Sequence, residues 1–237
     1  MDKNSKGDNR PVIELKDVWK VYDMGHIKVN ALRGMTMKVM KDEFIAIMGP
    51  SGSGKSTAMN MVGALDIPSK GAIYLDGHDI SKLHESDLAQ IRGKKIGFIF
   101  QSFNLINSLT AMENVMLAMM FQGTDEQTRK KKAAELLTMV GLADRMHHKP
   151  TELSGGQQQR VAIARSLAND PEIVLADEPT GNLDSLSGEN IMKMLMDLHH
   201  KEKRTIILVT HDKQVASHAE KIYLLKDGRI EGIKRVK

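Results

Sequence analysis

The stretch FIAIMGPSGSGKST, residues 44–57, joins an apolar run to a loop rich in glycine and serine. The run FIAIM (44–48) has the length and continuous apolar character of a strand that is buried on both faces of a parallel sheet. The following GPSGSGKS (49–56) matches the pattern G-x-x-x-x-G-K-[ST], whose backbone N–H groups surround phosphates at a helix N-terminus. Residues 58–65 continue with helical character. This part of the chain therefore predicts a strand, a phosphate-binding loop and a helix in succession.

The loop pattern also predicts what two of its side chains do. Lys55 bridges the β- and γ-phosphates of a nucleotide, and Ser56 is a ligand of Mg²⁺. Because the pattern stands between a strand and a helix, as phosphate binding requires, a chance match is rare. The candidate phosphate-binding residues are Gly49, Pro50, Ser51, Gly52, Ser53, Gly54, Lys55, Ser56 and Thr57.

A second apolar run, IVLA at residues 173–176, ends in two adjacent carboxylates, Asp177 and Glu178. Taken alone, a carboxyl pair after a strand is most often a solvated strand end. Beside a phosphate-binding loop, however, Asp177 is placed to hold Mg²⁺ and Glu178 to polarise an attacking water. We expect the two apolar strands to lie side by side, so that the loops at their carboxyl ends face one nucleotide.

Strand and helix patterns alternate on both sides of a helical stretch in the middle of the chain. Residues 111–121 and 126–140 are helical in composition, and no strand-like run separates them. We therefore predict one α/β domain over residues 11–237, with a mainly parallel core, an antiparallel β edge and a helical subdomain inserted at about residues 103–152. Residues 1–10 are predicted to be a disordered tail.

Composition excludes several classes of protein. The chain has 237 residues and no cysteine, which excludes disulfide frameworks, thiol catalysis and zinc–thiolate sites. Its longest apolar runs are shorter than the roughly 18 residues that a spanning helix needs, and its polar N-terminus predicts a cytoplasmic protein. The net charge of +4 is spread along the chain instead of forming a basic stripe. We therefore expect no nucleic-acid partner.

The pentapeptide LSGGQ (153–157) connects these motifs to a known family. By itself it would be a glycine-containing loop with Ser154 as a helix cap. With the phosphate loop before it and VLADEPT (174–180) after it, the sequence resembles the signature of ATP-binding-cassette (ABC) ATPases. The resemblance spans about residues 12–232 and implies the RecA-like fold of P-loop NTPases.

The other motif positions of that family are filled as well. Gln101 follows the strand pattern IGFIF and matches the Q-loop, and His211 follows TIILVT and matches the switch histidine. Residues 182–184 (NLD) match the D-loop, although it begins Gly181-Asn182 where many members have Ser-Ala. Tyr22 occupies the position of the aromatic residue that stacks on adenine.

The resemblance implies that the chain binds and hydrolyses ATP with Mg²⁺, working as a head-to-tail dimer. In that dimer the LSGGQ loop of one copy caps the γ-phosphate that the other copy holds, while Glu178 orients the water and His211 contacts the γ-phosphate. The implied catalytic residues are Glu178, His211, Lys55 and Gln101, and the implied Mg²⁺ ligands are Ser56, Gln101 and Asp177. Outside the phosphate loop, the implied nucleotide-binding residues are Tyr22, Gln101, Ser154, Gly155, Gly156, Gln157 and Asp184.

Two further stretches resemble one subfamily, which powers lipoprotein release, macrolide and peptide export, or cell-division membrane complexes. They are ALRG (31–34) and FIFQSFNLINSLTAMENV (98–115). This implies a membrane-spanning permease on a separate chain, docked near residues 102–105, and a peripheral location on the inner face of the cell membrane. The alternatives are an importer ATPase or a soluble cassette acting on nucleic acid or ribosomes. The soluble class is disfavoured because Ser154 follows Lys55 by only 99 residues, which leaves no room for a long coiled coil.

Overall fold

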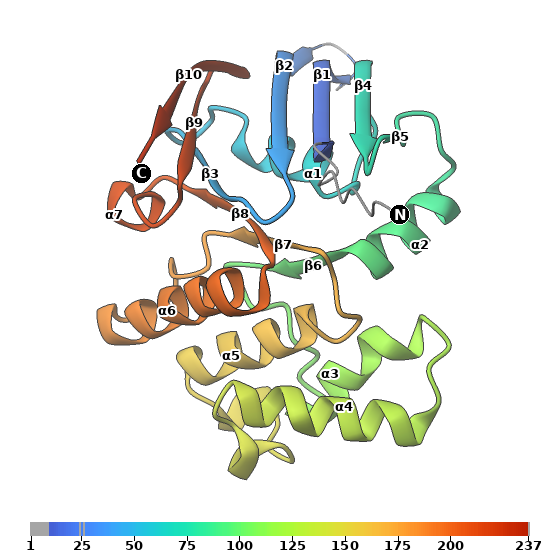
Figure 1. Ribbon diagram of the computed structural model, residues 1–237, viewed down its shortest axis with the longest axis vertical. Helices are drawn as coiled ribbons and strands as arrows, with labels where there is room; N and C mark the ends of the chain where they lie inside the picture. The colour runs from blue at the N-terminus through green and yellow to red at the C-terminus, as the bar shows by residue number, and fades with distance from the viewer. Residues whose placement is uncertain (1–9, 24, 26, 237) are drawn as a thin grey trace, which may run out of the picture.

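The computed structural model describes residues 10–23, 25 and 27–236. The predicted disordered tail, residues 1–10, lies outside this part of the chain except for Arg10. Two β-sheets and the helices around them form three layers, with an antiparallel sheet on one side and most of the helices on the other (Figure 1).

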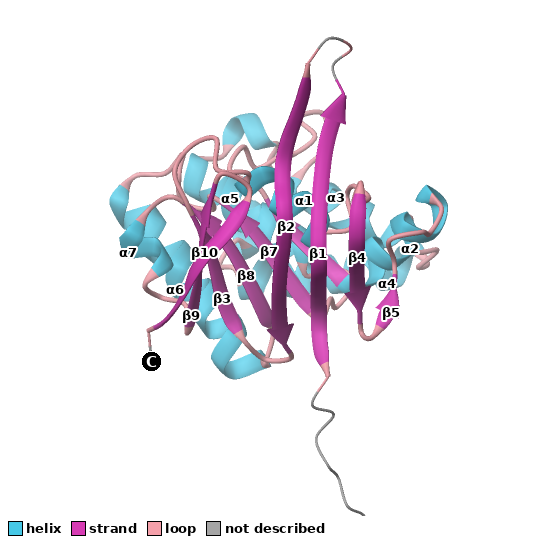
Figure 2. Ribbon diagram, turned by 90° about the horizontal axis from the view of Figure 1, so that it is seen from above, coloured by secondary structure: helices cyan, strands magenta, loops and turns pink. Residues whose placement is uncertain are grey.

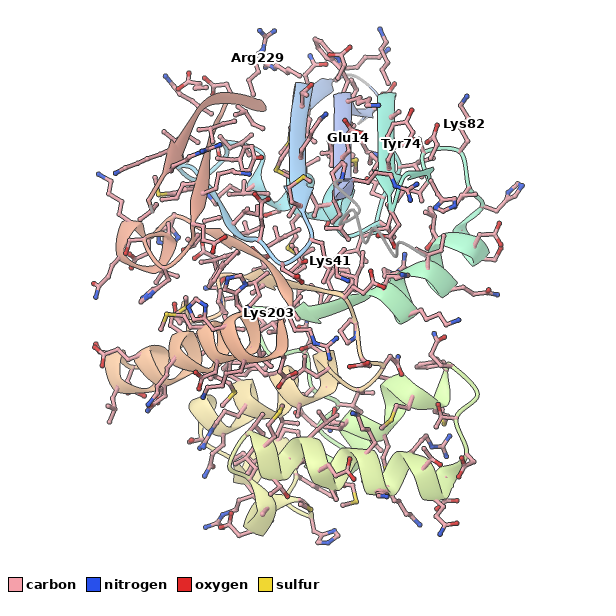
Figure 3. The ribbon with its side chains drawn as sticks, in the orientation of Figure 1. Glu14, Lys41, Tyr74, Lys82, Lys203 and Arg229 are labelled. Atoms are coloured by element: carbon pink, nitrogen blue, oxygen red, sulfur yellow. The ribbon has the colours of Figure 1, made fainter. Side chains whose placement is uncertain are left out.

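The predicted antiparallel β edge is a separate sheet of four strands. In sheet order it consists of β2 (Lys28–Met40), β1 (Pro11–Asp23), β4 (Lys70–Leu75) and β5 (His78–Asp79). Figure 3 labels Glu14 and Tyr74, which are direct partners on neighbouring strands. The β1–β2 hairpin extends well beyond the rest of the sheet (Figure 2). Most side chains at its far end are half-buried or exposed, so they contribute little to the core.

The second sheet is mainly parallel, as predicted. In sheet order it consists of β10 (Arg229–Arg235), β9 (Lys221–Lys226), β3 (Phe44–Met48), β8 (Thr205–Thr210), β7 (Ile173–Asp177) and β6 (Ile96–Ile99). Only β10 runs antiparallel to its neighbour within this sheet. The parallel strands present their carboxyl ends at one edge, which is where ligands bind in such folds.

The central strands are buried on both faces because successive side chains enter two different cores. Ile45 and Ile47 pack with helix α1 (Lys55–Val62) and the antiparallel sheet, whereas Phe44 and Ala46 pack with the helices on the opposite face. Strands β7 and β8 alternate in the same way. This double burial explains why these strands appear in the sequence as continuous apolar runs.

The remaining helices are α2 (Glu85–Lys95), α3 (Ala111–Met120), α4 (Glu126–Met139), α5 (Gly155–Ser166), α6 (Ser185–Glu202) and α7 (Lys213–Ala216), with short 3₁₀ turns at Ala143–Arg145 and Pro150–Glu152. The sequence analysis missed α2 because Leu88 is its only buried residue, so it has no apolar stripe. Within the described residues, no helix combines the length and the apolar content needed to cross a membrane.

One expectation about the sheet is wrong. Strands β3 and β7 were expected to be neighbours, but β8 lies between them and pairs with both. The phosphate loop and Asp177 therefore start two strand spacings apart, about 10 Å. Their loops still leave the same edge of the sheet, because all three strands run parallel.

A buried asparagine organises the loop that precedes α3. The Asn114 side chain is fully buried, and its amide nitrogen donates to the carbonyls of Ile106, Leu109 and Thr110. Its amide oxygen accepts a hydrogen bond from Ile106 N. One side chain thus contacts four backbone groups of the loop, two of which, Ile106 N and the Leu109 carbonyl, it alone pairs among the contacts of the described residues.

Asn114→Ala should lower the free energy of unfolding by about 2 kcal/mol, because it removes the hydrogen bonds of a fully buried side chain and leaves Ile106 N and the Leu109 carbonyl without this partner. Urea denaturation followed by circular dichroism measures the loss. Asn190→Ala, at an exposed position of α6, is the matched control and should stay within about 0.5 kcal/mol of wild type. Equal stability of the two variants would contradict the bridging role of Asn114.

Candidate functional site

The phosphate loop connects β3 to α1 and leaves the helix N-terminus open. Gly54, the residue before α1, has a φ of 99°, and no side chain caps this helix within the described residues. By contrast, α3, α4, α5 and α6 are each capped by a side chain. The first N–H groups of α1 are therefore available for an anion, and the helix dipole favours one there.

Lys55 and Ser53 show how the loop is arranged without a ligand. Lys55 Nζ donates to the carbonyls of Gly49 and Pro50, at 2.9 and 3.0 Å, so the ammonium group lies over the loop. Ser53 is 2% exposed, and its hydroxyl has no hydrogen-bond partner within the described residues. A loop with a poised cation, a buried unpaired hydroxyl and free N–H groups fits the phosphates of a nucleotide.

Three segments that are distant in sequence line a pocket of about 460 Å³ around this loop. This volume lies within the range of small-molecule sites. The lining residues are Ser51, Gly52, Gly54, Lys55, Ser56 and Thr57 of the loop, Val29, Asn30, Ala31 and Arg33 of β2, and Asp227 and Gly228 between β9 and β10. Sequence reasoning missed all six residues outside the loop. The ALRG motif and the Asp-Gly turn are visible in the sequence, but nothing in it indicates that they meet here.

Tyr22, the predicted adenine-stacking residue, lies one strand away from this pocket. It is on β1 opposite Val29, which does line the pocket. The Tyr22 hydroxyl donates to Asp66 Oδ2 at 3.2 Å, and Lys20 Nζ binds the other oxygen of the same carboxylate at 2.6 Å. These contacts hold the Tyr22 ring beside the end of α1.

Asp177 at the end of β7 is a partly buried carboxylate. Burial raises its pKa, the neighbouring charge of Glu178 raises it further, and Lys55 of the phosphate loop lowers it. The Lys55 ammonium group therefore lies close enough to Asp177 to act on its carboxyl electrostatically. An excess of negative charge at a half-buried carboxylate is typical of a cation site. Together with the oxygen donors of Ser56 and Gln101, Asp177 supplies the ligand chemistry that Mg²⁺ prefers.

Glu178 is held by the end of β8. Its Oε1 accepts a hydrogen bond from His211 N at 3.0 Å and lies 2.6 Å from His211 Nδ1, while Oε2 accepts from Thr210 Oγ1 at 3.0 Å. Glu178 also has a φ of 44°, in the left-handed region that non-glycine residues adopt uncommonly.

Gln101 follows β6 and contacts the D-loop. Its Nε2 donates to Asn182 Oδ1 at 3.3 Å, and Asn182 Nδ2 donates to the Gln101 carbonyl at 3.0 Å. A Cβ atom on Gly181 would lie 2.6 Å from Gln101 Nε2. The Gly181-Asn182 variant of the D-loop therefore provides both the space and the partner for this glutamine.

The LSGGQ loop lies beside the D-loop and not beside the phosphate loop. Ser154 caps α5, with its Oγ accepting from Gln157 N at 3.3 Å and Gln157 Oε1 accepting from Ser154 N at 2.8 Å. A Cβ on Gly156 would lie 2.9 Å from Ser187 Oγ of α6, and Gly155 faces Leu183. Figure 1 shows α5 and α1 on opposite sides of the parallel sheet. One copy of the chain therefore does not bring its own signature to its own phosphate loop.

Asp184, the last residue of the D-loop, caps α6. Its Oδ1 accepts a hydrogen bond from Ser187 N at 2.9 Å, and hydrogen bonds from the side chain and then the backbone N–H of Ser187 hold the pKa of the Asp184 carboxyl below its usual range. Within one chain, its carboxylate therefore orients the start of α6 and is not part of the phosphate-loop pocket.

Comparison with known proteins identifies the family. The family model for ABC transporters matches residues 32–181. The chain belongs to the ABC transporter family. It is an ATP-binding and ATP-hydrolysing subunit of the kind that powers these transporters, as its motifs predict.

Relatives and solved structures of this ABC subunit cover nearly its whole length. An uncharacterised ABC transporter ATP-binding protein of Thermotoga maritima is 53% identical, over 95% of this chain and 96% of that protein. The macrolide export ATP-binding/permease protein MacB of Wolinella succinogenes is 52% identical over 93% of this chain, which spans only 34% of that protein.

The fold agrees with solved ABC cassettes. The cassette MJ0796 of Methanocaldococcus jannaschii, a dimer in a post-hydrolysis state bound to ADP and Pi, aligns with a TM-score of 0.88 and 47% identity, covering 95% of this chain and 99% of that one. CbiO1 of Clostridium perfringens, part of the transporter complex cbiONQ, aligns with a TM-score of 0.85 and 27% identity over 96% of this chain and 90% of that one.

Asp177→Asn should raise the melting temperature of the nucleotide-free protein by about 2 °C at pH 7. Because the pKa of Asp177 is raised in the folded protein, the folded state holds this charge less favourably than the unfolded chain does. The advantage of the variant should shrink as the pH falls through the raised pKa and vanish below about pH 4, where both states protonate the carboxyl. Calorimetry at several pH values tests this, and a variant that melts below wild type at pH 7 would contradict it.

Proposed function

We propose that this subunit binds MgATP at the phosphate-loop pocket and hydrolyses it in a head-to-tail dimer, driving a separate membrane-spanning permease of the export, lipoprotein-release or macrolide-efflux type. The observation that carries the proposal is the convergence of Lys55, Asp177 and the Glu178–His211 pair at one edge of the parallel sheet. The MacB relatives support the export assignment.

The phosphates of ATP would bind the open N-terminus of α1, where Lys55 exchanges its contacts with the Gly49 and Pro50 carbonyls for phosphate oxygens. Ser56, Gln101 and Asp177 would hold Mg²⁺, which neutralises phosphate charge when bound. Val29 and Tyr22 lie on adjacent strands at the side of the pocket, where the adenine would lie against them.

Glu178 would orient the attacking water and accept its proton. Its side chain is only 15% exposed, compared with 67% for His211, so the protein holds the carboxylate in place while the imidazole remains free to reach the γ-phosphate. Thr210 and the His211 backbone N–H bind Glu178 from β8, which keeps one carboxylate geometry before ATP arrives. Preorganisation of this kind is how phosphoryl transfer is accelerated.

A second copy would complete the site. Ser154 is exposed at the N-terminus of α5, on the far side of the sheet from α1, so it can meet only the phosphates held by another chain. The dimeric state of MJ0796 supports this arrangement. The helix N-terminus behind LSGGQ would add N–H donors and a favourable dipole to the γ-phosphate.

Glu178→Gln should lower ATP turnover at least about 100-fold while ATP affinity is kept, because the amide cannot accept the proton of the attacking water. The variant should accumulate as an ATP-bound dimer, which size-exclusion chromatography detects. Glu189→Gln, at an exposed position of α6, is the matched control and should hydrolyse ATP like wild type. Wild-type turnover by the Glu178 variant would refute the proposed role.

The permease would dock in a cleft of about 670 Å³ between the parallel sheet and the helical layer. Phe98 and Phe100 stack at one wall of the cleft, and Phe121 at the end of α3 is 76% exposed. Arg165 lines the same cleft and donates to the carbonyls of Phe103 and Asn104, just after Gln101. A cytoplasmic helix of the permease seated there would sense movement of Gln101. This docking would place the subunit peripherally on the inner face of the cell membrane.

The Glu178→Gln form, trapped with ATP in cells, should co-purify from gently solubilised membranes with a permease of few spans and a large extracytoplasmic domain. Adding Phe121→Asp should abolish this co-purification without changing the ATP affinity of the isolated subunit, because a charge cannot be desolvated in an apolar cleft. Mass spectrometry identifies the partners. A permease with many spans would indicate an importer, and ribosomes or DNA without a membrane protein would overturn the transporter proposal.

A further inference from the structure

The turn between β9 and β10 contacts the phosphate loop although about 175 residues separate them in the sequence. Gly228 N donates to the carbonyl of Ser53 at 2.9 Å, and the Gly228 carbonyl accepts from Arg33 N of β2 at 2.9 Å. Figure 3 labels Arg229, the first residue of β10, directly after this turn. A single glycine therefore joins the phosphate loop to the antiparallel sheet through two backbone hydrogen bonds.

No side chain fits at this glycine. Gly228 has a φ of +76°, and a Cβ atom there would lie 2.6 Å from the Ala31 carbonyl oxygen and 3.0 Å from Leu32 Cα. Both obstructing atoms belong to the backbone of β2, so they cannot move aside as a side chain would. Gly54 of the loop approaches the same Ala31 oxygen, where its own Cβ would also lie at 2.6 Å. The turn, the loop and β2 are thus in direct backbone contact.

The same hairpin also contacts the start of the loop. A Cβ on Gly49 would lie 2.2 Å from the carbonyl oxygen of Leu225, which is buried at the end of β9. Strand β9 pairs with β3 directly below the loop, with Leu224 opposite Met48. The hairpin therefore restrains the loop near both of its ends.

From these contacts we propose that the β9–β10 turn, through Gly228, is a positioning element of the nucleotide site. It holds the phosphate loop in the shape in which the loop N–H groups converge on phosphate, and so sets the affinity for nucleotide. A loop that is already ordered loses less conformational entropy on binding. Asp227 and Gly228 also line the pocket, and a Cβ on Gly54 would lie 3.5 Å from Gly228 Cα, so the turn borders the pocket beside the start of α1. This inference rests on the proposed role of the phosphate loop.

Gly228→Ala should weaken the binding of ATP and ADP about tenfold or more, as the loss of one well-placed backbone hydrogen bond would. The KM for ATP should rise in parallel, while kcat at saturating ATP should stay within about twofold, because the turn touches neither Glu178 nor His211. Fluorescence titration with a labelled ATP analogue and steady-state ATPase assays provide the two readouts. A purely structural role would lower the folded fraction and kcat instead.

Gly232→Ala is the matched control in the same hairpin. A Cβ at Gly232 would contact only Leu224 Cδ1, at 3.8 Å, so this variant should bind ATP like wild type. Lys55→Ala distinguishes a failure of the phosphate-loop assignment from a failure of the positioning role of the turn. If it binds ATP like wild type, the phosphate-loop assignment fails. If it loses binding while Gly228→Ala does not, only the positioning role of the turn is overturned.

Hydrogen exchange of the wild-type protein tests the proposal even if the Gly228→Ala variant does not fold. Binding of a non-hydrolysable ATP analogue should slow exchange of the Gly228 amide together with that of the loop amides, because that amide is bonded to Ser53 of the loop. Helix α2 should be unaffected, since it lines no part of this pocket. Protection of the loop with unchanged exchange at Gly228 would overturn the proposal.

Discussion

Strands β3, β7 and β8 bury successive side chains alternately in two cores, and the positions of the phosphate loop, Asp177, Glu178 and His211 depend on this double burial. Fully burying one large apolar side chain contributes about 1.5–3 kcal/mol, and these strands contain almost nothing else. They are therefore held rigidly in parallel register, and their carboxyl ends deliver Lys55, Asp177 and the Thr210-His211 pair to one edge. Polar groups at that edge can lack some hydrogen-bond or ionic partners, because the buried apolar strands supply the stability of the fold.

In the empty protein, the charges of Asp177, Glu178 and Lys55 at this edge are not fully compensated. The pKa of Asp177 is raised by burial and by Glu178, and only Lys55 opposes the shift. Lys55 meanwhile contacts two carbonyl oxygens, which a phosphate would replace with a stronger, charged partner. A bound nucleotide with its cation would supply the missing partners of both side chains. The same balance explains why we expect removal of the Asp177 charge to stabilise the empty protein while it removes a proposed metal ligand.

The location of the LSGGQ loop is the reason why the proposed site needs a second copy. Ser154 and Gly156 lie against the D-loop and α6, across the sheet from α1. The contact between Gln101 and Asn182 joins the D-loop to the loop beside the proposed permease cleft. The signature, the D-loop and the cleft therefore form one connected surface, through which dimer closure and permease movement would be coupled in the proposed transporter.

By itself, the sequence determined the strands, the phosphate loop, the family and the identity of the motif residues. Each of these features depends on short runs of residues that are adjacent in the sequence. Contiguous apolar runs reveal buried strands, and local glycine spacing reveals the phosphate loop. Tertiary structure alone decided that β8 separates β3 from β7, that Glu178 adopts a positive φ beside His211, and that Gly228 bonds to Ser53. It also decided that Tyr22 is held by Asp66, one strand away from the pocket. These features are contacts between segments far apart in the chain, and local patterns contain no information about which distant backbone will meet them.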